Sequence, residues 1–425
     1  MNKFLSVSEL IYFIENQKRI DPKVNLDKMR GFCKVFGNPE KTFKSIHVTG
    51  TNGKGSVVSY LRSIFMEHGL NVATFTSPYI TKFNERIACN NEPISDEDLL
   101  EIGNLIISKY DTFEELNLCT PSFFEFVTLI GFIYFSKKQI DLAIIEVGIG
   151  GTLDSTNVID SNAAVITNVN FDHMNILGNT LEEILENKLG ILKPNTHLIV
   201  GLKDQHLIEI AKEKSLKLHS SFSTPLLNAF EIKKCDILSS QFSVEGLGEF
   251  EIFLPGIHQI ENALVAIESF LITKNIFGIN YLDISKIKEG LRKTSWPGRL
   301  EVVSNNPLIL LDGGHNIDGV TRVCEFVKTL NYSKKRCIFA CSDNKEKEKM
   351  IKQISPVFDE IIITSFTYKR HSSAQELFEY LDHPNKILIE DIDEIIQFVY
   401  NNPLDFNLFL GSLYFVSEMR PKLKA

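Results

Sequence analysis

A glycine-rich loop near the N-terminus constrains the fold more than any other feature of this sequence. It reads TGTNGKGS over residues 49–56, follows a short β-rich run at residues 44–49, and opens a helical pattern that ends at Gly69. The glycines let the backbone turn several N–H groups toward one anion, and the start of the helix adds the positive end of its dipole. A strand, such a loop and a helix in this order predict a phosphate-binding loop in an α/β fold.

Beyond this loop, strand-like and helix-like segments alternate along most of the chain. This order predicts a mostly parallel sheet covered by helices, which is an α/β fold. The next strands are predicted at residues 71–76, 141–147 and 163–169, and the helices at residues 96–110, 122–137 and 180–190.

Two segments interrupt this rhythm and predict the domain organisation. Residues 217–254 contain short alternating runs, which predict an antiparallel insertion on the nucleotide-binding domain. Trp296-Pro297-Gly298 is a turn signal that predicts a linker. We therefore expect an ATP-binding domain over residues 1–297 and a smaller Rossmann-like α/β domain over residues 298–425. Strands of the smaller domain are predicted at residues 308–311, 336–341, 360–364 and 407–410.

Charge and composition exclude several classes of protein. A formal net charge of −9 argues against a broad surface for nucleic acid or an anionic membrane. The seven cysteines form no C-x-x-C pair, so neither a disulfide framework nor a zinc site is predicted. Residues 1–20 read as an amphipathic helix rather than a signal peptide, and the most apolar window, residues 123–135, is too short to span a bilayer. We expect a cytoplasmic monomer that binds small molecules.

Polar residues follow two predicted strands at the edge where α/β sheets hold their ligands. Glu146 ends the apolar run AIIE, and Asp312 follows the run LILL, with His315 close behind it. In the loop, Lys54 can neutralise the charge of the β- and γ-phosphates, and the Ser56 hydroxyl can approach a phosphate or its Mg²⁺. A solvated strand end is the alternative for Glu146 on pattern alone.

The loop and a series of further blocks resemble the folylpolyglutamate synthase and dihydrofolate synthase branch of the Mur ligase superfamily. The compressed form G-T-N-G-K-G-S is similar to the ATP loop of that superfamily. The remaining blocks run in family order over almost the whole chain. They are TSP at 76–78, FNERI at 83–87, EVGIGG at 146–151, DSTNVI at 154–159, DH at 172–173, KLGILKP at 188–194, HQ at 258–259, NA at 262–263, PGR at 297–299, DGGHN at 312–316 and GSLY at 411–414.

The resemblance implies which residues bind ATP and its metal ions. Asn262 would contact the base, and Arg299 and Asp312 would reach ATP from the smaller domain. One Mg²⁺ would bind Ser77 and Glu146. A second would bind His173 and Lys188, once the Lys188 amine has reacted with CO₂ to give a carbamate. The resemblance also admits K⁺ or another monovalent cation. The loop residues that it assigns to ATP are Gly50, Thr51, Asn52, Gly53, Lys54, Gly55 and Ser56.

The resemblance further implies an ATP-dependent ligase that joins L-glutamate to the carboxylate of dihydropteroate or a reduced folate. The carboxylate would first become an acyl phosphate, and closure of the two domains would protect it from water. The residues expected to act in catalysis are Lys54, Lys188, Arg299 and His315. Phe83 and Arg86 lie in a loop that would touch the pterin end or shape its pocket, and a structural role is the alternative for Arg86.

Three alternatives stay open at this stage. The chain could be a dihydrofolate synthase, a folylpolyglutamate synthase, or both. Another Mur-type ligase, acting on a UDP-linked precursor, would share the chemistry but usually carries an extra N-terminal domain, for which a loop at residue 50 leaves no room. A nucleotide-binding ATPase switch would keep the loop and Glu146 but would not need Arg299, Asp312 and His315.

Overall fold

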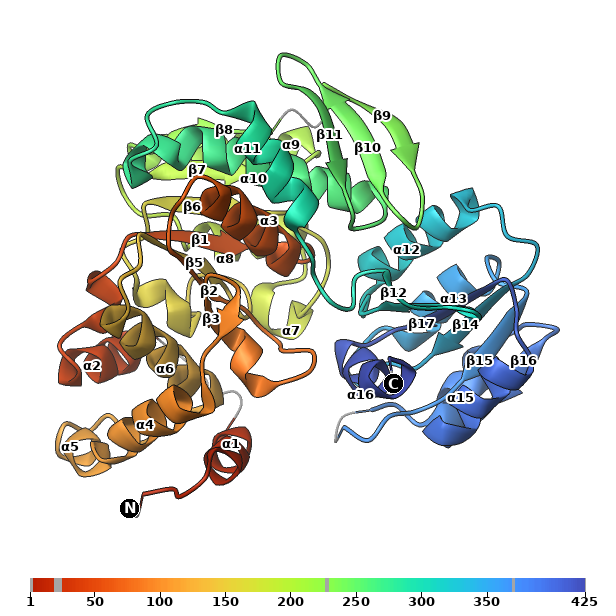
Figure 1. Cartoon of the computed structure of the whole chain (residues 1–425). Coiled ribbons are helices and arrows are strands. Elements are labelled where there is room, and N and C mark those ends of the chain that lie inside the picture. The colour runs from red at the N-terminus through yellow and green to blue at the C-terminus, as the bar shows by residue number, and fades with distance from the viewer. Residues whose placement is uncertain (1–2, 19–24, 226–228, 369–370, 425) are drawn as a thin grey trace. The chain divides into compact units, whose positions relative to one another are not determined.

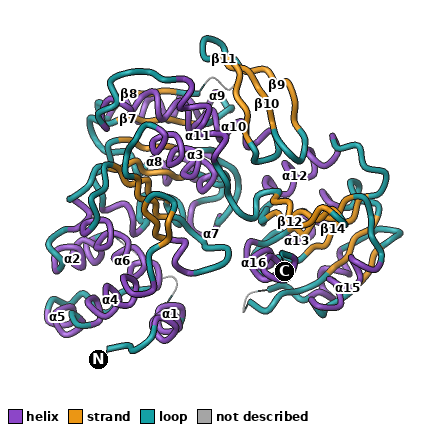
Figure 2. Tube along the Cα trace, viewed as in Figure 1, coloured by secondary structure: helices purple, strands orange, loops and turns teal. Residues whose placement is uncertain are grey.

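The chain folds into two compact units, each with its own sheet and hydrophobic core. The structure is a computed structural model and describes residues 3–18, 25–225, 229–368 and 371–424. The first unit comprises Met1–Phe230 and Glu261–Lys293, and the second comprises Glu231–Ile260 and Thr294–Ala425. Figure 1 shows both units with their elements labelled, and Figure 2 shows where helices, strands and loops lie along the trace.

The first unit is built on an eight-stranded sheet in the order β4-β3-β2-β5-β1-β6-β7-β8. The six strands from β2 to β8 pair in parallel, and β3 and β4 add an antiparallel edge. Central strands such as LAIIE and AAVI are buried along their whole length, and apart from the terminal Glu146 their residues are apolar, because helices cover both faces of the sheet. The strands are β1 (Ser45–Thr49), β2 (Val72–Phe75), β3 (Ile87–Cys89), β4 (Glu92–Pro93), β5 (Leu142–Glu146), β6 (Ala163–Ile166), β7 (His197–Val200) and β8 (Ser221–Ser223).

Several helices of the first unit begin at side chains that cap them. Ser122 and Glu125 form a capping box at the start of α6, and Thr180 and Glu183 form another at α8. The helices are α1 (Val7–Glu15), α2 (Asp27–Val35), α3 (Lys54–Glu67), α4 (Asp96–Ile107), α5 (Tyr110–Glu115), α6 (Phe123–Lys137), α7 (Met174–Leu177), α8 (Leu181–Leu189), α9 (Gln205–Lys217), α10 (Ile257–Thr273) and α11 (Ile284–Lys293). Four short 3₁₀ turns among the described residues are η1 (Pro39–Lys41), η2 (Phe83–Arg86), η3 (Ser155–Val158) and η4 (Lys274–Phe277).

The second unit contains two sheets. A six-stranded sheet has the order β12-β13-β17-β14-β15-β16, with only β12 antiparallel, and a three-stranded sheet has the order β11-β10-β9. Its strands are β9 (Phe230–Cys235), β10 (Ser240–Val244), β11 (Gly248–Ile252), β12 (Glu301–Asn305), β13 (Leu308–Asp312), β14 (Lys335–Phe339), β15 (Glu360–Ile363), β16 (Lys386–Leu388) and β17 (Phe406–Leu410). Its helices are α12 (Ile317–Thr329), α13 (Lys347–Ile354), α14 (Ala374–Tyr380), α15 (Ile392–Asn401) and α16 (Leu413–Leu423).

The predicted α/β class, with a large mostly parallel sheet and a second C-terminal α/β domain, is confirmed. The segment at residues 217–254 does contain an antiparallel sheet, and its assignment to the nucleotide-binding domain stays a prediction. The sheet groups with the second unit because Cys235 and Ile237 pack against the core of the C-terminal α/β sheet. The division after residue 297 stays a proposal.

The N-terminal helix and the cysteines follow the sequence-based expectations. The helix predicted within residues 1–20 is α1, although residues 1–2 and 19–20 lie outside the described part of the chain. All seven cysteines are free thiols. In the part of the chain that the structure describes, no helix combines the length and the apolarity needed to cross a membrane.

Candidate active site

The phosphate loop lies between the end of β1 at Thr49 and the start of α3 at Lys54. Gly53 has a φ of 80°, in the left-handed region, and a Cβ there would lie 2.3 Å from Oδ1 of Asn262. Both facts require glycine at this position. The close approach also shows that Asn262, on α10, packs directly against the loop. The base-contacting residue expected from the sequence is therefore beside the phosphate loop.

Residues after β6 brace the loop from the other side. The amide of Asn52 donates to Oδ1 of Asn168 at 2.8 Å, and the amide of Thr51 donates to the same oxygen at 3.1 Å. Thr167 donates from Oγ1 to the carbonyl oxygen of Asn52. These two loop amides are thus engaged within the protein and hold the shape of the loop. The donors left for a phosphate are the amides of the first turn of α3, which have no partner within the helix.

Two side chains at the start of α3 have the properties of phosphate or metal ligands. Lys54 donates from Nζ to the carbonyl oxygens of Gly50 at 2.9 Å and Thr51 at 3.2 Å, which keeps its charge over the loop. The Ser56 side chain is 2% exposed, and its hydroxyl has no hydrogen-bond partner among the described residues. A buried hydroxyl without a partner is costly, so Ser56 is suited to a ligand oxygen or a metal ion.

Glu146 and Ser77 come together next to the loop. Glu146 ends β5, the neighbour of β1, and it is paired in register with Val48. Its Oε2 accepts a hydrogen bond from the backbone amide of Ser77 at 3.0 Å, and Arg86 donates from Nη1 to the Ser77 hydroxyl at 3.1 Å. The two residues that the sequence assigns to one Mg²⁺ therefore share one corner of the sheet.

Lys188 provides an unusual buried amine. Its side chain is 1% exposed at the end of α8. The pKa of the amine is lowered from 10.5 to about 7, mainly by burial and also by the charge of Lys54, while Asp172 opposes the shift. A substantial fraction of this amine is neutral near pH 7. His173 lies beside Asp172, with 3.9 Å between Nε2 and Oδ1 of Asp172, so the structure gathers Lys54, Asp172, His173 and Lys188 in one region.

The second unit gathers Arg299, Asp312 and His315 around one turn. Both oxygens of Asp312 accept backbone hydrogen bonds, from Leu300 at 2.9 Å and from Gly314 at 2.7 Å. Burial raises the pKa of the Asp312 carboxyl, while Arg299 and these amides oppose the shift. Nδ1 of His315 donates to the carbonyl oxygen of Gly313 at 3.0 Å, which leaves Nε2 as the acceptor of the neutral ring.

Phe83 and Arg86 are more deeply buried than side chains that contact a ligand from an exposed loop would be. They are 4% and 5% exposed. The Arg86 guanidinium lies 5.0 Å from the ring of Tyr79, 5.6 Å from that of Phe83 and 5.3 Å from that of Phe123. Stacking on three rings fixes the guanidinium next to Ser77.

The oxygen atoms in the first unit fit a magnesium ion that arrives with ATP. Mg²⁺ prefers oxygen ligands and usually takes only one or two from the protein when phosphates supply others. Within the described ranges, no group of three or more His, Cys, Asp or Glu is arranged to hold a metal. The buried Glu146 carboxylate and the unpartnered Ser56 hydroxyl are a suitable minimal set.

Sequence reasoning placed the loop residues but missed the residues that brace them. Thr167, Asn168 and Asn170 hold Thr51 and Asn52 in place. The run TNVN directly after a buried strand was the available signal, because polar residues at that edge of a parallel sheet meet the loop from the neighbouring strand.

Comparisons with known proteins place this geometry in a family. The Mur ligase middle domain model matches residues 115–270, and the model of the Mur ligase, glutamate ligase domain matches residues 298–413. A dihydrofolate synthase/folylpolyglutamate synthase of Bacillus subtilis is 33% identical over 432 residues, which cover 99% of this chain and 100% of that protein.

Solved structures agree with these matches. The crystal structure of the folylpolyglutamate synthase of Thermotoga maritima is 28% identical, with a TM-score of 0.85 over 99% of this chain and 97% of that one. A folylpolyglutamate synthase in complex with AMPPCP and folate is 27% identical, with a TM-score of 0.86 over 99% of this chain and all of that one. The chain belongs to the dihydrofolate synthase/folylpolyglutamate synthase family, whose members are ATP-dependent ligases with the Mur ligase fold.

Proposed function

We propose that this protein uses ATP to join the amino group of L-glutamate to the carboxylate of dihydropteroate or of a reduced folate. The observation that carries the proposal is the polar edge of the first unit, where Lys54, Ser56 and Glu146 meet beside a glycine-rich loop in a chain related over its full length to such ligases. The chain requires no protein nucleophile for this reaction, because ATP itself activates the substrate carboxylate.

In the proposed reaction the first unit binds the phosphates. The loop from Gly50 to Ser56 encloses them, Lys54 neutralises their charge, and Asn262 contacts the base. Ser77, Glu146 and His173 would hold Mg²⁺, which supplies charge neutralisation at the phosphates when it is bound. The proposal includes K⁺ or another monovalent cation only as an ion that binds in addition to Mg²⁺.

Lys188 is proposed to act as a carbamate. The neutral amine attacks the carbon of CO₂, a C–N bond forms as one C=O π bond opens, and a proton leaves the nitrogen to solvent, so that the neutral buried amine becomes an anion. The lowered pKa of Lys188 supports this step because it provides the neutral amine near pH 7. The negative carbamate would attract the positive charge of Lys54, whereas a protonated Lys188 would repel it. The carbamate would also offer oxygen atoms to a second Mg²⁺.

Arg299, Asp312 and His315 are proposed to act in the same reaction from the second unit. The substrate carboxylate attacks the γ-phosphorus, which gives an acyl phosphate and ADP. The amine of glutamate then attacks the acyl carbon, forms the amide and expels phosphate. Arg299 would stabilise the charge on the phosphoryl group, Asp312 would bind ATP, and His315 would approach the phosphate and the reacting carboxylate.

The pterin end of the substrate is assigned to the neighbourhood of Phe83 and Arg86. Their burial supports a role in shaping the wall of the pocket through Tyr79 and Phe123 rather than broad contact with a ligand. A cytoplasmic location and a monomeric state are also proposals, and the seven free thiols are consistent with the first.

The test is an assay of the amide product. The protein is incubated with ATP, Mg²⁺ and L-glutamate, with dihydropteroate or tetrahydrofolate in parallel, and the products are detected by mass. Product with dihydropteroate alone identifies a dihydrofolate synthase, with tetrahydrofolate alone a folylpolyglutamate synthase, and with both a bifunctional enzyme. Absence of any amide product from protein that still binds ATP would contradict the proposal.

A further inference from the structure

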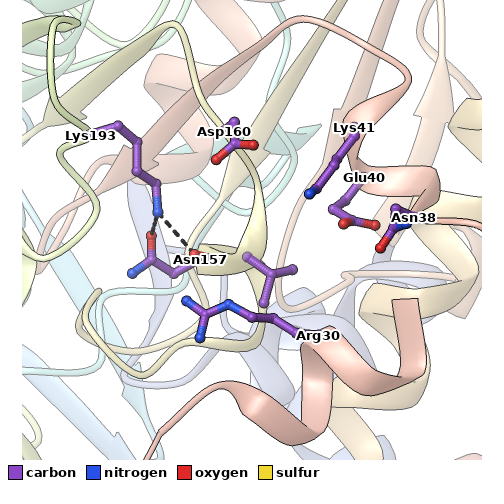
Figure 3. Close-up of a pocket in the computed structure, with 8 residues that line it drawn as sticks. Arg30, Asn38, Glu40, Lys41, Asn157, Asp160 and Lys193 are labelled. Atoms are coloured by element: carbon purple, nitrogen blue, oxygen red, sulfur yellow. Dashed lines mark hydrogen bonds between the residues drawn. The ribbon is translucent and has the colours of Figure 1, made fainter. Parts of the chain in front are cut away.

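A polar cavity lies in the first unit, away from the phosphate loop. Its volume is about 180 Å³, which is enough for several waters or a small solute. The residues that line it are Arg30, Asn38, Glu40, Lys41, Asn157, Val158, Asp160 and Lys193. None of them has a part in the reaction proposed above. Figure 3 shows side chains from separate elements extending toward this one space.

The topology places this cavity at the opposite edge of the sheet from the phosphate loop. Lys41 lies shortly before β1, Asp160 shortly before β6, and Lys193 shortly before β7. Because these strands are parallel, the residues before them meet at the amino edge of the sheet. The phosphate loop and Glu146 follow β1 and β5, at the carboxyl edge. A ligand in the cavity would therefore be separate from bound ATP.

The buried part of the cavity contains a carboxylate that lacks a full set of partners. Glu40 is 4% exposed, and its Oε2 has no hydrogen-bond partner among the described residues. The 3₁₀ turn η1, entered through Asn38 at a φ of 57°, directs Glu40 inward and leaves Lys41 exposed at the rim. An unpartnered buried carboxylate oxygen is costly unless a donor or a cation reaches it.

On another side of the cavity, Lys193 is held in a fixed position. Its Nζ donates to the backbone carbonyl oxygen of Asn157 at 3.0 Å and to Oδ1 of Asn157 at 2.8 Å. Asn157 in turn donates to the carbonyl oxygens of Thr152 and Gly190. An ammonium has three donors, so this network leaves one N–H of Lys193 for a further acceptor. Burial lowers the pKa of the Lys193 amine. The charge of Asp160 raises this pKa and the charge of Arg30 lowers it, so both charges lie close enough to Lys193 to interact with it.

The charges of the lining indicate the chemistry of an occupant. Three cations, Arg30, Lys41 and Lys193, and two carboxylates, Glu40 and Asp160, line the cavity, so the lining has a formal net charge of one positive unit. The Arg30 guanidinium also pairs with Asp27, outside the lining, at 3.2 Å. The Glu40 carboxylate has a hydrogen bond from the Cys33 thiol, and a small anion alone would satisfy the cations but would leave Oε2 of Glu40 without a partner. An α-amino acid with an acidic side chain has two carboxylates, which can pair with the cations of the lining, and one ammonium, which can pair with its carboxylates. Its net charge is opposite in sign to the formal charge of the lining.

We propose that this amino-edge cavity is a binding site for a free acidic α-amino acid, of the glutamate type, distinct from the site at which the ligase reaction takes place. The carboxylates of the ligand bind Lys193, Arg30 and Lys41, and its ammonium binds Glu40. The site gives the protein a way to sense the amino acid without consuming it. The inference does not depend on the proposed ligase activity, because it rests on the cavity alone.

The test measures binding to the full chain by calorimetry without ATP or Mg²⁺. L-glutamate is compared with glutarate, which lacks the ammonium, and with inorganic phosphate. We expect glutamate to bind about tenfold more tightly than glutarate, because only glutamate offers a charged donor to Glu40. Absence of glutamate binding, or equal binding of glutarate or phosphate, would overturn the proposal.

Variants test which residues form the site and which group of the ligand each residue binds. Glu40→Gln should weaken glutamate binding by about tenfold while leaving glutarate binding equal or tighter, because it removes the partner of the ammonium and a repulsion of the dicarboxylate. Lys193→Met should weaken both ligands. If Lys193→Met does not fold, Lys41→Ala, on the exposed rim, tests the same charge. Lys34→Ala, an exposed lysine of α2 outside the cavity, is the matched control and should leave both affinities unchanged.

A failure of the proposed amino-acid site can be distinguished from a failure of the proposed ligase activity. Lys54→Ala, which disrupts the phosphate loop, should retain glutamate binding at the amino-edge cavity. Loss of glutamate binding in Lys54→Ala, together with normal binding in Glu40→Gln, would overturn the proposal by assigning the binding to the carboxyl edge.

Discussion

The polar edges of the two sheets differ in how fully their buried groups are partnered. In the first unit, the Ser56 hydroxyl has no partner among the described residues, and the buried Lys188 amine lies near the cation Lys54. In the second unit, both oxygens of the buried Asp312 accept backbone hydrogen bonds, and His315 is held by the Gly313 carbonyl oxygen. The first edge carries buried groups that a ligand must complete, whereas the buried Asp312 carboxylate of the second edge already has its partners.

This difference separates functional groups from bracing groups. Unpartnered buried polar atoms and buried like charges reduce stability, so a folded chain keeps them where binding or catalysis needs them. A saturated carboxylate at a turn instead adds stability, and it fixes the backbone that carries Arg299 and His315. The predictions below compare how substitutions at the two edges change activity and stability.

The largest effect is expected at Lys54. Lys54→Ala removes the charge that neutralises the transferred phosphoryl group, and we expect ATP-dependent turnover to fall by about 10³-fold or more. The measurement is ADP release with substrate and glutamate. Lys212→Ala, an exposed lysine on α9, is the control. Near-normal turnover in Lys54→Ala would remove the phosphate-loop assignment.

His315 should affect turnover far more than ATP binding. We expect His315→Ala to reduce turnover by about 10²-fold, because the histidine acts on the reacting groups rather than on the nucleotide. ATP affinity is measured separately by calorimetry. His206→Ala, at an exposed histidine of the first unit, serves for comparison. An unchanged rate would mean that His315 has no catalytic role.

Lys188 should produce a characteristic dependence of stability on pH. Below about pH 7 its amine is protonated in both the folded and the unfolded chain, so burial of the charge costs its full amount. Between about pH 7 and 10.5 only the unfolded chain keeps the proton, so the stability contributed by this residue rises with pH. Relative to Lys188→Met, the free energy of unfolding of the native protein should rise by roughly 1 kcal/mol per pH unit across this window.

Chemical denaturation in CO₂-free buffer over that pH range provides the measurement. Lys188→Met should also lose most turnover at pH 7 while being at least as stable as the native protein. The range from pH 7 to pH 10 lies within the window between the folded and unfolded pKa values of Lys188. If the difference in stability between the two proteins stays constant over this range, the buried amine is not the titrating group.

The smallest expected effect is at Asp312, where stability should change in the opposite direction. Asp312→Asn leaves one acceptor oxygen for two buried backbone donors, and we expect the free energy of unfolding to fall by about 2 kcal/mol. Urea denaturation measures the change, with the exposed Asp393→Asn as the control. A variant as stable as the native protein would mean that Asp312 does not brace the turn.

The sequence predicted the architecture well where local and long-range signals agreed. Continuous apolar runs such as LAIIE and LILL became buried parallel strands, and the glycine-rich loop marked the site because Gly53 needs a left-handed φ and a close neighbour. The short strands β3, β4, β7, β8, β9, β12 and β16 were not predicted, because strands of two to six residues carry little periodic signal.

Other features depend on packing that periodicity does not encode. The antiparallel segment near residues 230–252 has strand patterns of its own, but only the contacts of Cys235 and Ile237 decide to which unit it belongs. The bracing of the loop by Asn168, and the burial of Lys188, arise from neighbours distant in the chain. The amino-edge cavity combines residues from η1, α2, η3 and two loops that are distant from one another in the chain.

The central claim is that the polar edge of the first unit uses ATP to activate a substrate carboxylate. The most direct measurement labels that carboxylate of dihydropteroate or tetrahydrofolate with ¹⁸O and analyses the released phosphate by mass. If an acyl phosphate forms, one labelled oxygen moves from the substrate to inorganic phosphate as the amide appears. Amide product accompanied by unlabelled phosphate would contradict the account.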